Sequence, residues 1–399
     1  MIQICPEEQC TGCGACANIC PKGCIDFTPD HEGFLFPQID PGKCIDCGLC
    51  RKICPVNSPA GFHPEQKDVY AAWALDEKIR RTSSSGGLYS VFANHCIEQG
   101  GMANGVSFNG DLYAVQGLFD SPDQIAGCRG SKYVQCVPGD IYSQVKKVLE
   151  AGRPVFFTST PCQVNALYKY LGRDHENLCT CDFICHGVPS PAFLKKNLLE
   201  ISGGRKEISG ISFRDLSGWG NYLLRLTADG ENCTEDKNGR LYSKLFLAGV
   251  NFRTACYQCP FARSGRVADV TIGDFWGLGK YAPFFHDTRK GVSLLMINTP
   301  KGGMLLDKVK DQLFLSRRSF REAARENHQL YRRVKKNVYR TDFYQDAQEL
   351  SGADMIKKYI PATKNPLWKK VLSIPRRIYC KILRIFTKVF VKLFIGRDK

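Results

Sequence analysis

Eight cysteines between residues 10 and 54 constrain this chain more than any other feature. They form two copies of the spacing C-x2-C-x2-C-x3-C, each followed by proline, with 34 residues between corresponding cysteines. The first copy is Cys10, Cys13, Cys16 and Cys20, and the second is Cys44, Cys47, Cys50 and Cys54. This spacing is typical of segments that hold two [4Fe–4S] clusters through thiolates. A zinc ribbon instead needs two separated C-x2-C pairs.

The spacing also predicts which cysteines share a cluster. Three thiolates within seven residues can surround one cubane, and the turn at the proline carries the fourth thiolate to the other cluster. By this rule Cys54 joins the first three cysteines of the first copy, and Cys20 joins the first three of the second copy. Cys5 and Cys24 fall outside the spacing, and we expect them to be small buried residues rather than ligands.

The rest of the chain is long enough for a larger domain. With 399 residues, 43% of them hydrophobic and 24% charged, the composition is that of a globular protein with two or three domains. The 21 cysteines would fit a secreted disulfide scaffold, but the chain opens MIQICPEEQC, with no apolar stretch behind a basic start. Thiolates that bind iron need a reducing compartment, so we expect a cytoplasmic protein.

The order of apolar runs predicts an α+β fold. A small ferredoxin-like dicluster domain is expected over residues 1–60, and a larger mixed α/β domain over 68–345, with an N-terminal part (68–150) and a C-terminal part (151–345). Buried strands are predicted at Val69–Ala74 and Pro154–Thr158. Strands and helices alternate without the regular βαβ rhythm of a doubly wound sheet. Residues 346–399 form a basic tail with an amphipathic helix.

A turn of small residues precedes a predicted helix over 88–97. Ser84, Ser85, Gly86 and Gly87 would leave backbone N–H groups and hydroxyls free at the positive end of that helix, which suits a phosphate or pyrophosphate. A plain capped turn contains almost the same residues. The pattern alone therefore leaves both interpretations open.

Four further cysteines stand in positions suited to a ligand or a nucleophile. Cys162 follows a buried strand at a predicted helix start, where the helix dipole would lower the pKa of a thiol. Cys185 ends another strand-like run. Cys256 and Cys259 form a C-x2-C pair followed by proline, which in a reducing compartment indicates metal binding with partners elsewhere in the chain.

Several segments together resemble the β-subunit family of coenzyme F420-reducing hydrogenase and formate dehydrogenase, iron–sulfur flavoproteins that include a chlorophyll reductase branch. The resemblance runs from about Val69 to Asn298. It is carried by Ser85-Gly86-Gly87, Gly130-Ser131-Lys132-Tyr133, Thr160-Pro161-Cys162-Gln163, Asp182 to Gly187, Cys256 to Pro260 and Gly273 to Gly277. The fused N-terminal domain is similar to that of a stand-alone bacterial branch often found near cell-surface polysaccharide genes.

The resemblance implies a bound FAD and a third [4Fe–4S] cluster. The implied FAD site consists of Ser84, Ser85, Gly86, Gly87, Ser131, Lys132, Tyr133, Thr160, Pro161 and Gln163. The implied ligands of the third cluster are Cys162, Cys185, Cys256 and Cys259, with Cys179 and Cys181 as rivals for the middle position. The substrate is not implied, because this branch spans organisms that need not make the deazaflavin.

Together these features predict an iron–sulfur flavoprotein oxidoreductase that passes electrons from ferredoxin-type clusters to FAD and on to an organic small molecule. The resemblance places it in cell-surface polysaccharide biosynthesis. A ferredoxin or a redox partner subunit would donate the electrons, and Lys132 and His186 are the candidate catalytic residues for proton delivery. The alternative is a subunit that is not an enzyme itself and relays electrons to a partner.

The positive charge of the chain is concentrated in its tail. Residues 357–399 contain thirteen Lys and Arg against Asp398, which accounts for +12 of the net charge of +16. On a helical projection of residues 375–395, five cations fall within an arc of roughly 80° and apolar residues fill the opposite side. The five cations are Arg377, Lys381, Arg384, Lys388 and Lys392.

A basic amphipathic helix of this kind is typical of peripheral association with an anionic membrane surface, here the inner face of the membrane. Its charges are too many for a transmembrane span. A helix docked on this protein or on a partner is the alternative. Nucleic acid is not the expected partner, because the basic face lacks interleaved aromatic residues.

Overall fold

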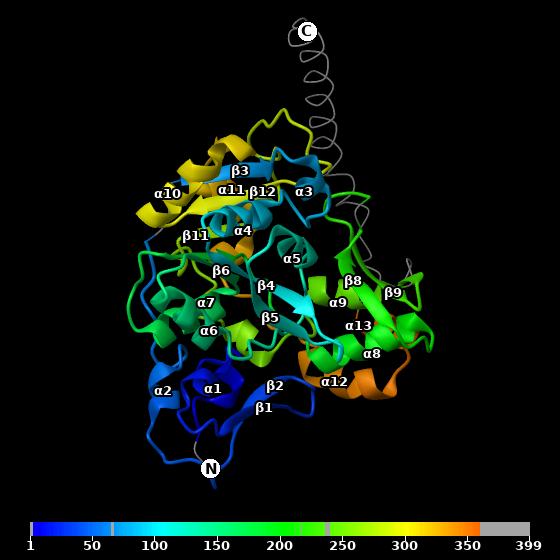
Figure 1. Cartoon of the computed structure of the whole chain (residues 1–399). Helices are drawn as coiled ribbons and strands as arrows, with labels where there is room; N and C mark the ends of the chain where they lie inside the picture. Colours follow the sequence, from blue (N-terminus) through cyan, green and yellow to red (C-terminus); the bar gives the residue numbers. More distant parts are fainter. Residues whose placement is uncertain (1–2, 65–67, 216, 236–239, 360–399) are drawn as a thin grey trace, which may run out of the picture.

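The computed structural model describes residues 3–64, 68–215, 217–235 and 240–359. They form a small N-terminal module and a larger domain built on an eight-stranded sheet with a three-stranded sheet at its side (Figure 1). The tail helix predicted over residues 375–395 lies outside the described residues. No helix in the described part of the chain is long and apolar enough to cross a membrane.

The N-terminal module consists of short helices and a two-stranded antiparallel sheet. Its elements are η1 (Glu7–Gln9), α1 (Ala15–Ile19), β1 (Ile25–Pro29), β2 (Leu35–Ile39) and α2 (Leu49–Ile53). The two helices begin after Gly14 and Gly48, whose φ angles of 82° and 71° lie in the left-handed region. Glycine adopts this conformation without strain, so each cysteine loop can turn tightly into its helix.

The larger domain is built on a mixed sheet in the order β13-β3-β12-β11-β7-β6-β4-β5. The four central strands, β11, β7, β6 and β4, are parallel, and the outer pairs are antiparallel. The strands are β3 (Asp68–Ala74), β4 (Met102–Phe108), β5 (Ala114–Phe119), β6 (Val155–Ser159), β7 (Leu178–Phe183), β11 (Val270–Asp274), β12 (Ser293–Ile297) and β13 (Leu313–Arg318). The predicted combination of a dicluster module and a mixed α/β domain is confirmed.

Helices cover both faces of this sheet. On β6, Phe156 packs with α4 and α10 on one face, whereas Val155 and Phe157 pack with α6 and α7 on the other. An apolar run buried on both faces is what a parallel strand requires. The helices around the sheet are α3 (Glu77–Arg81), α4 (Leu88–Glu98), α5 (Pro122–Gly127), α6 (Ile141–Glu150), α7 (Pro161–Leu171), α10 (Pro300–Val309), η3 (Lys310–Gln312), α11 (Phe320–Glu326) and η4 (His328–Leu330).

The second sheet is antiparallel, in the order β10-β9-β8, and packs against four helices. These elements are α8 (Pro191–Ser202), β8 (Ile208–Arg214), β9 (Tyr222–Ala228), β10 (Glu231–Thr234), α9 (Leu241–Ala248), α12 (Arg340–Glu349) and α13 (Gly352–Tyr359). Phe34 of the N-terminal module belongs to the same apolar core as Phe193 and Tyr242. The module is therefore packed against the larger domain.

Polar contacts strengthen this junction. Tyr142 Oη donates to the carbonyl oxygen of Cys13 at 2.6 Å. Arg340 Nη1 lies 2.7 Å from Glu32 Oε1 in an ion pair between α12 and the module. Figure 1 shows the module, in blue, beside α6 and α7.

The carboxyl ends of the parallel strands meet at one edge of the large sheet. Ser159 ends β6, Phe183 ends β7 and Asp274 ends β11. Asp274 pairs with Ser293, the first residue of the antiparallel β12, so the start of β12 lies at the same edge. Loops at this edge are the usual ligand sites of open α/β sheets.

Candidate functional site

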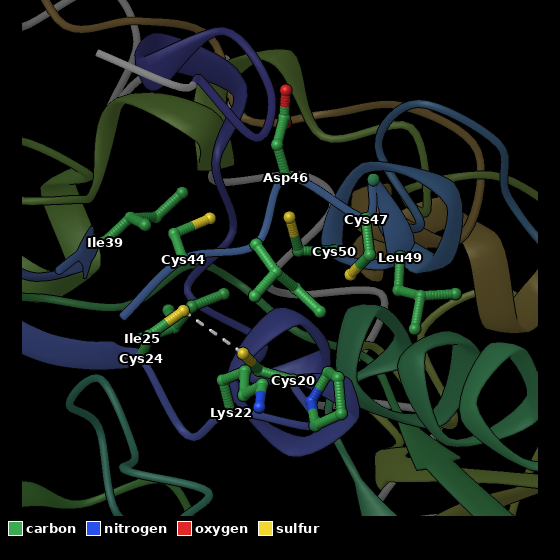
Figure 2. A pocket seen from close by; sticks show the side chains of 13 residues that line it. Cys20, Lys22, Cys24, Ile25, Ile39, Cys44, Asp46, Cys47, Leu49 and Cys50 are labelled. Atoms are coloured by element: carbon green, nitrogen blue, oxygen red, sulfur yellow. Dashed lines mark hydrogen bonds between the residues drawn. The ribbon is translucent and has the colours of Figure 1, made fainter. Parts of the chain in front are cut away.

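Two cavities in the N-terminal module gather its cysteines in the crossed arrangement. One is lined by Cys10, Cys13, Cys16 and Cys54, which we name the first cysteine set. The other is lined by Cys20, Cys44, Cys47 and Cys50, the second cysteine set (Figure 2). Each set takes three cysteines from one copy of the spacing and the fourth from the other. Four thiols around one cavity fit a [4Fe–4S] cluster.

The two sets differ in their exposure. All four cysteines of the first set are buried, whereas in the second set Cys47 is exposed and the other three are half-buried. Ile45 and Leu49, which are 58% and 38% exposed, border the second cavity at the surface. The second set is therefore the one that a molecule in solution can approach.

Each cavity also contains a fifth cysteine. Cys24 is buried, as expected, but its Sγ lies 3.3 Å from the Sγ of Cys20, and Figure 2 shows the two side chains pointing toward one another. Cys5 borders the first cavity, and its hydrogen bonds to the thiols of Cys10 and Cys54 raise its pKa. The spacing gave no sign of these contacts, because they depend on the folded loops.

Four cysteines from distant parts of the larger domain also come together. Cys162 is the second residue of α7, Cys185 follows β7, and Cys256 and Cys259 lie at the 3-10 helix η2 (Thr254–Gln258). Burial raises the pKa of Cys185, and the charges of Cys256, Cys162 and Cys259 raise it further. Burial and the charge of Cys162 likewise raise the pKa of Cys259 to about 11. We name these four residues the third cysteine set.

The pKa of Cys162 is raised, not lowered as expected from its place at a helix start. Burial dominates, although the hydroxyl of Thr160, 3.2 Å from the thiol, acts in the opposite direction. A buried thiol of this kind is a poor free nucleophile, because little of it is thiolate near neutral pH. Its place among the candidate metal ligands rests instead on its neighbours in the third cysteine set.

The rival cysteines lie elsewhere. Cys179 and Cys181 are on β7, in or against the apolar layer that contains Phe156. Cys162 and Cys259 instead border the layer on the opposite face of the sheet. The fold thus brings Cys185, and neither rival, to the other three cysteines.

Within the described parts of the chain, no three His, Cys, Asp or Glu side chains stand in position to hold a single metal ion. That statement includes the first and second sets as well as the third. The thiolates of a cubane each bind a different iron, so they stand further apart than the ligands of one ion. None of the three sets is therefore arranged as the ligands of a single zinc ion.

The third set adjoins the first set. Burial raises the pKa of Cys13, and the charges of Cys16 and Cys162 raise it further. Tyr142 lies near both, since after burial the charges of Cys13 and Cys162 are the largest causes of its raised pKa. The charge of Cys50, in the second set, is in turn one of the causes that raise the pKa of Cys16. The sets therefore follow one another in the order second, first, third.

The turn Ser84–Gly87 lies at the start of α4, beside β12. Ser84 Oγ accepts a hydrogen bond from the backbone N–H of Ser131 at 2.7 Å, which joins the two predicted FAD segments. The hydroxyl of Ser85 is buried and has no hydrogen-bond partner among the described residues. A Cβ on Gly86 would lie 2.4 Å from the carbonyl oxygen of Ala72, so packing on β3 already requires glycine there.

The segment Thr160–Gln163 is held by its own hydrogen bonds. Gln163 Oε1 accepts from Ser159 Oγ at 2.6 Å and from Thr160 Oγ1 at 3.0 Å. Pro161 is the first residue of α7, and its fixed φ suits that position. Gln163 is buried, so its amide shapes the turn that presents Cys162.

Lys132 and His186 occupy separate places. Lys132 Nζ donates to the carbonyl oxygens of Cys128 (2.7 Å) and Arg129 (3.0 Å) at the end of α5, and burial lowers its pKa to about 8. The His186 ring lies between Phe246 and Phe252, with centroid distances of 5.3 and 5.2 Å, and burial lowers its pKa. Its Nε2 has no hydrogen-bond partner in the described structure, and no hydrogen bond there joins the two residues.

Sequence reasoning missed an arginine at the same sheet edge. Arg214 Nη2 lies 2.6 Å from Asp274 Oδ2, and Arg214 Nε donates to Tyr133 Oη at 2.8 Å. Trp219 Nε1 donates to Asp274 Oδ1 at 2.7 Å, and its ring stacks on that of Trp276 at 5.1 Å. Asp274 and Trp276 belong to a motif of the sequence, but Arg214 precedes Asp274 by 60 residues, and only the fold brings the two together.

Two family models of the coenzyme F420 hydrogenase/dehydrogenase beta subunit match the chain. The N-terminal model covers residues 69–140 and the C-terminal model covers residues 152–322, together more than half of the chain. This chain belongs to that family. A 4Fe-4S dicluster domain model matches residues 9–58, which contain the first and second cysteine sets.

A solved structure is also similar: the xenon-derivatised F420-reducing [NiFe] hydrogenase complex from Methanosarcina barkeri, with 15% sequence identity and a TM-score of 0.43. The match covers 75% of this chain and 92% of the matched chain. No curated protein matches the chain. As a member of the coenzyme F420 hydrogenase/dehydrogenase beta subunit family with an N-terminal dicluster domain, the chain is an iron–sulfur redox protein.

Proposed function

We propose that this chain is an iron–sulfur flavoprotein oxidoreductase that passes electrons from its [4Fe–4S] clusters to FAD and on to an organic substrate. The observation that carries the proposal is the third cysteine set, which adjoins the first set and stands at the carboxyl edge of the large sheet. A cluster there would connect the dicluster module to the edge where α/β sheets bind ligands.

The exposure of the cysteines supports a direction for the electrons. The second set borders the surface at the exposed Cys47, the first set is buried, and the four cysteines of the third set are half-buried within the larger domain. An electron donor such as a ferredoxin or a redox partner subunit would meet the second set. The residues of the module would then hold two clusters in sequence between that donor and the third set.

The sheet edge fits an FAD phosphate at one point. The unpartnered hydroxyl of Ser85 precedes the eleven-residue helix α4, whose N-terminal dipole and free N–H groups favour an anion. Ser131 and Tyr133 line the same edge of the sheet. The backbone N–H of Ser131 donates a hydrogen bond to Ser84, and the hydroxyl of Tyr133 accepts one from Arg214. When bound, FAD supplies the conversion between one-electron and two-electron transfer.

Lys132 and His186 remain the candidates for proton delivery. A lysine whose pKa is about 8 can donate a proton near neutral pH, provided that its amino group leaves the two carbonyl oxygens it now contacts. For His186 the support is its position beside Cys185 and the unpartnered Nε2. Their roles would be separated by testing which variant lowers turnover while leaving cluster and flavin content unchanged.

The experiment that tests the flavin compares two serines of the same turn. In Ser85→Asp a carboxylate replaces the buried hydroxyl and would repel a phosphate, so protein-bound absorbance at about 450 nm, where flavins absorb, should be lost. Ser83→Asp is the matched control, because Ser83 Oγ is already bonded to the carbonyl oxygen of Ile79 at 2.7 Å. Full flavin content in Ser85→Asp would remove this turn from the FAD site.

The second candidate function is an electron relay that is not catalytic by itself. The family description of a beta subunit and the exposed second set favour a partner enzyme. Anaerobic reduction of the isolated chain, followed by a screen of small-molecule acceptors, separates the two. Turnover by the isolated chain supports the oxidoreductase, whereas turnover only after addition of a partner subunit supports the relay.

The cellular context is part of the same proposal. A role in cell-surface polysaccharide biosynthesis is supported by the likeness of the fused dicluster arrangement to one bacterial branch of the family. Attachment to the anionic inner face of the membrane is supported by the basic amphipathic sequence of residues 375–395.

A further inference from the structure

Arg253 is buried at the junction between the N-terminal module and the larger domain. It is 1% exposed and immediately precedes η2, which carries Cys256. Its Nε donates to the carbonyl oxygen of Cys10 at 2.6 Å, and its Nη1 donates to the carbonyl oxygen of Leu35 at 3.0 Å. The guanidinium therefore lies against the loop that carries the first cysteine set.

The charge of Arg253 has no carboxylate partner among the described residues. Three other buried arginines do have one: Arg214 pairs with Asp274, Arg266 with Asp182 and Arg340 with Glu32. The fifth, Arg80, is near the charges of Glu77 and Asp287. In addition, Nη2 of Arg253 has no hydrogen-bond partner in the described structure.

An isolated buried charge is costly, because the interior does not solvate it as water does. The ring of Phe36, whose centroid lies 3.6 Å from Arg253 Cζ, offsets part of this cost through a cation–π contact. No carboxylate of the described residues neutralises the charge that remains on Arg253. A [4Fe–4S] cluster with four thiolate ligands carries net negative charge, so it supplies what Arg253 lacks.

Arg253 contacts residues of both the first and the third cysteine sets. On one side its Nε donates to the carbonyl oxygen of Cys10. On the other side its own carbonyl oxygen accepts a hydrogen bond from the backbone N–H of Cys256 at 2.9 Å. Arg253 thus lies between the first and the third cysteine sets.

We propose that Arg253 is the counter-ion of the cluster at the first cysteine set and of the cluster at the third set, and that it raises the reduction potentials of both. The part that concerns the third set rests on the proposed function. A positive charge with a free N–H donor stabilises the more negative, reduced cluster over the oxidised one. Electrons that arrive at the exposed second set would therefore pass inward to the first set with a favourable change in potential.

The test is a redox titration of the anaerobically purified full chain, followed by electron paramagnetic resonance. In Arg253→Gln the charge is removed, and the one-electron reduction of the first cluster should become at least tenfold less favourable, which corresponds to about 59 mV for each factor of ten. Arg253→Lys keeps the charge. The equilibrium constant for one-electron reduction of the first cluster should therefore stay within about threefold of the wild-type value.

Arg340→Gln combined with Glu32→Gln is the matched control. Arg340 is also buried and also joins the module to the larger domain, through Glu32 and through the carbonyl oxygen of Phe252, which its Nε contacts at 2.6 Å. Glu32 is substituted together with Arg340, because a lone Glu32 carboxylate would add a negative charge at the junction. With both charges removed, the net charge of the junction is unchanged, and the potential of the first cluster should stay the same. A shift as large as that of Arg253→Gln would mean that disturbing the junction, not the charge, moves the potential, and would overturn the inference.

The remaining outcomes also decide the matter. An unchanged potential in Arg253→Gln overturns the inference. If Arg253→Gln holds no first cluster, Arg253→Lys decides. A first cluster at the wild-type potential in Arg253→Lys supports the role as counter-ion. Loss of the first cluster from Arg253→Lys as well assigns Arg253 a purely structural role. If the wild-type protein contains no third cluster, the proposed function fails, but the potential of the first cluster still tests Arg253.

Discussion

The first and third cysteine sets lie side by side, but they are assembled in opposite ways. The first set comes from two short loops of one small module, and each loop turns at a glycine into its own helix. The third set comes from the end of β6 with α7, the end of β7, and η2. Its geometry therefore depends on how β7 pairs with β6 and β11, whereas that of the first set does not.

The largest expected difference between the two sets comes from Asp182 on β7. Its carboxylate is fully buried, lies 2.8 Å from Arg266 Nη2, and accepts from the hydroxyl of Thr271 on β11 at 2.6 Å. Asp182→Asn leaves the guanidinium without its charge partner, which should cost about 3 kcal/mol of unfolding free energy. Urea unfolding measures this loss, and iron should leave the third set before the first.

An exposed ion pair is the control for Asp182. Arg205 and Glu231 pair at the surface, and Glu231→Gln should change the unfolding free energy little because solvent screens the pair. Equal loss of iron from all three sets in Asp182→Asn would contradict this account, because only the third set should depend on the pairing of β7 in the sheet.

A second prediction tests the crossed ligands of the module. Cys20→Ala combined with Cys24→Ala should remove about four iron atoms from the second set and leave the first set loaded, although Cys20 belongs to the first copy of the spacing. The double variant is needed because Cys24 Sγ lies 3.3 Å from Cys20 Sγ and is near enough to replace it. Iron analysis with electron paramagnetic resonance measures the result.

Cys233→Ala is the control for these substitutions, since Cys233 lies on β10 outside all three sets. It should keep the full iron content. Loss of the first cluster in place of the second, in the double variant, would show that each cluster takes all its ligands from one copy of the spacing.

The smallest effect on the clusters is expected from the tail. Deletion of residues 374–399 should release the protein from anionic vesicles, because Lys and Arg near such a surface contribute about 1 kcal/mol each. Both the first and the third sets should keep their iron. A flotation assay measures binding, and high salt should weaken but not abolish it, since apolar burial is not screened.

Two outcomes would contradict the membrane assignment. The intact chain should bind neutral vesicles more weakly than anionic ones, because neutral lipid offers no charge to the basic face. If the intact chain ignores anionic vesicles, or if the truncation unfolds the larger domain, the tail has a structural role instead.

The module could be predicted in detail from the sequence because its ligands are close together in the chain. Spacing alone predicts that Cys20 belongs with the second copy and Cys54 with the first. The cysteines that line the two cavities have this arrangement. In contrast, no spacing distinguishes Cys185 from Cys179 and Cys181. That choice depends on which face of β7 each residue occupies and on where the strand ends.

The sheet edge was harder to predict for the same reason. The turn that contains Gly86 fits a phosphate site, but the carbonyl oxygen of Ala72 lies against the position that a Cβ of residue 86 would occupy, and this explains the glycine without a ligand. The ammonium of Lys132 is bound to nearby carbonyl oxygens, and Arg214 meets Asp274 only through the fold. Contacts between residues far apart in the chain leave no local pattern.

Iron content per chain tests the central proposal most directly. Three cubanes require about twelve iron atoms in the anaerobically purified protein, and Cys256→Ser combined with Cys259→Ser should lower the content to about eight. Cys179→Ser, the control, should keep about twelve, because that residue lies apart from the third set. About eight iron atoms in both the wild type and the Cys256/Cys259 variant would contradict a cluster at the third cysteine set.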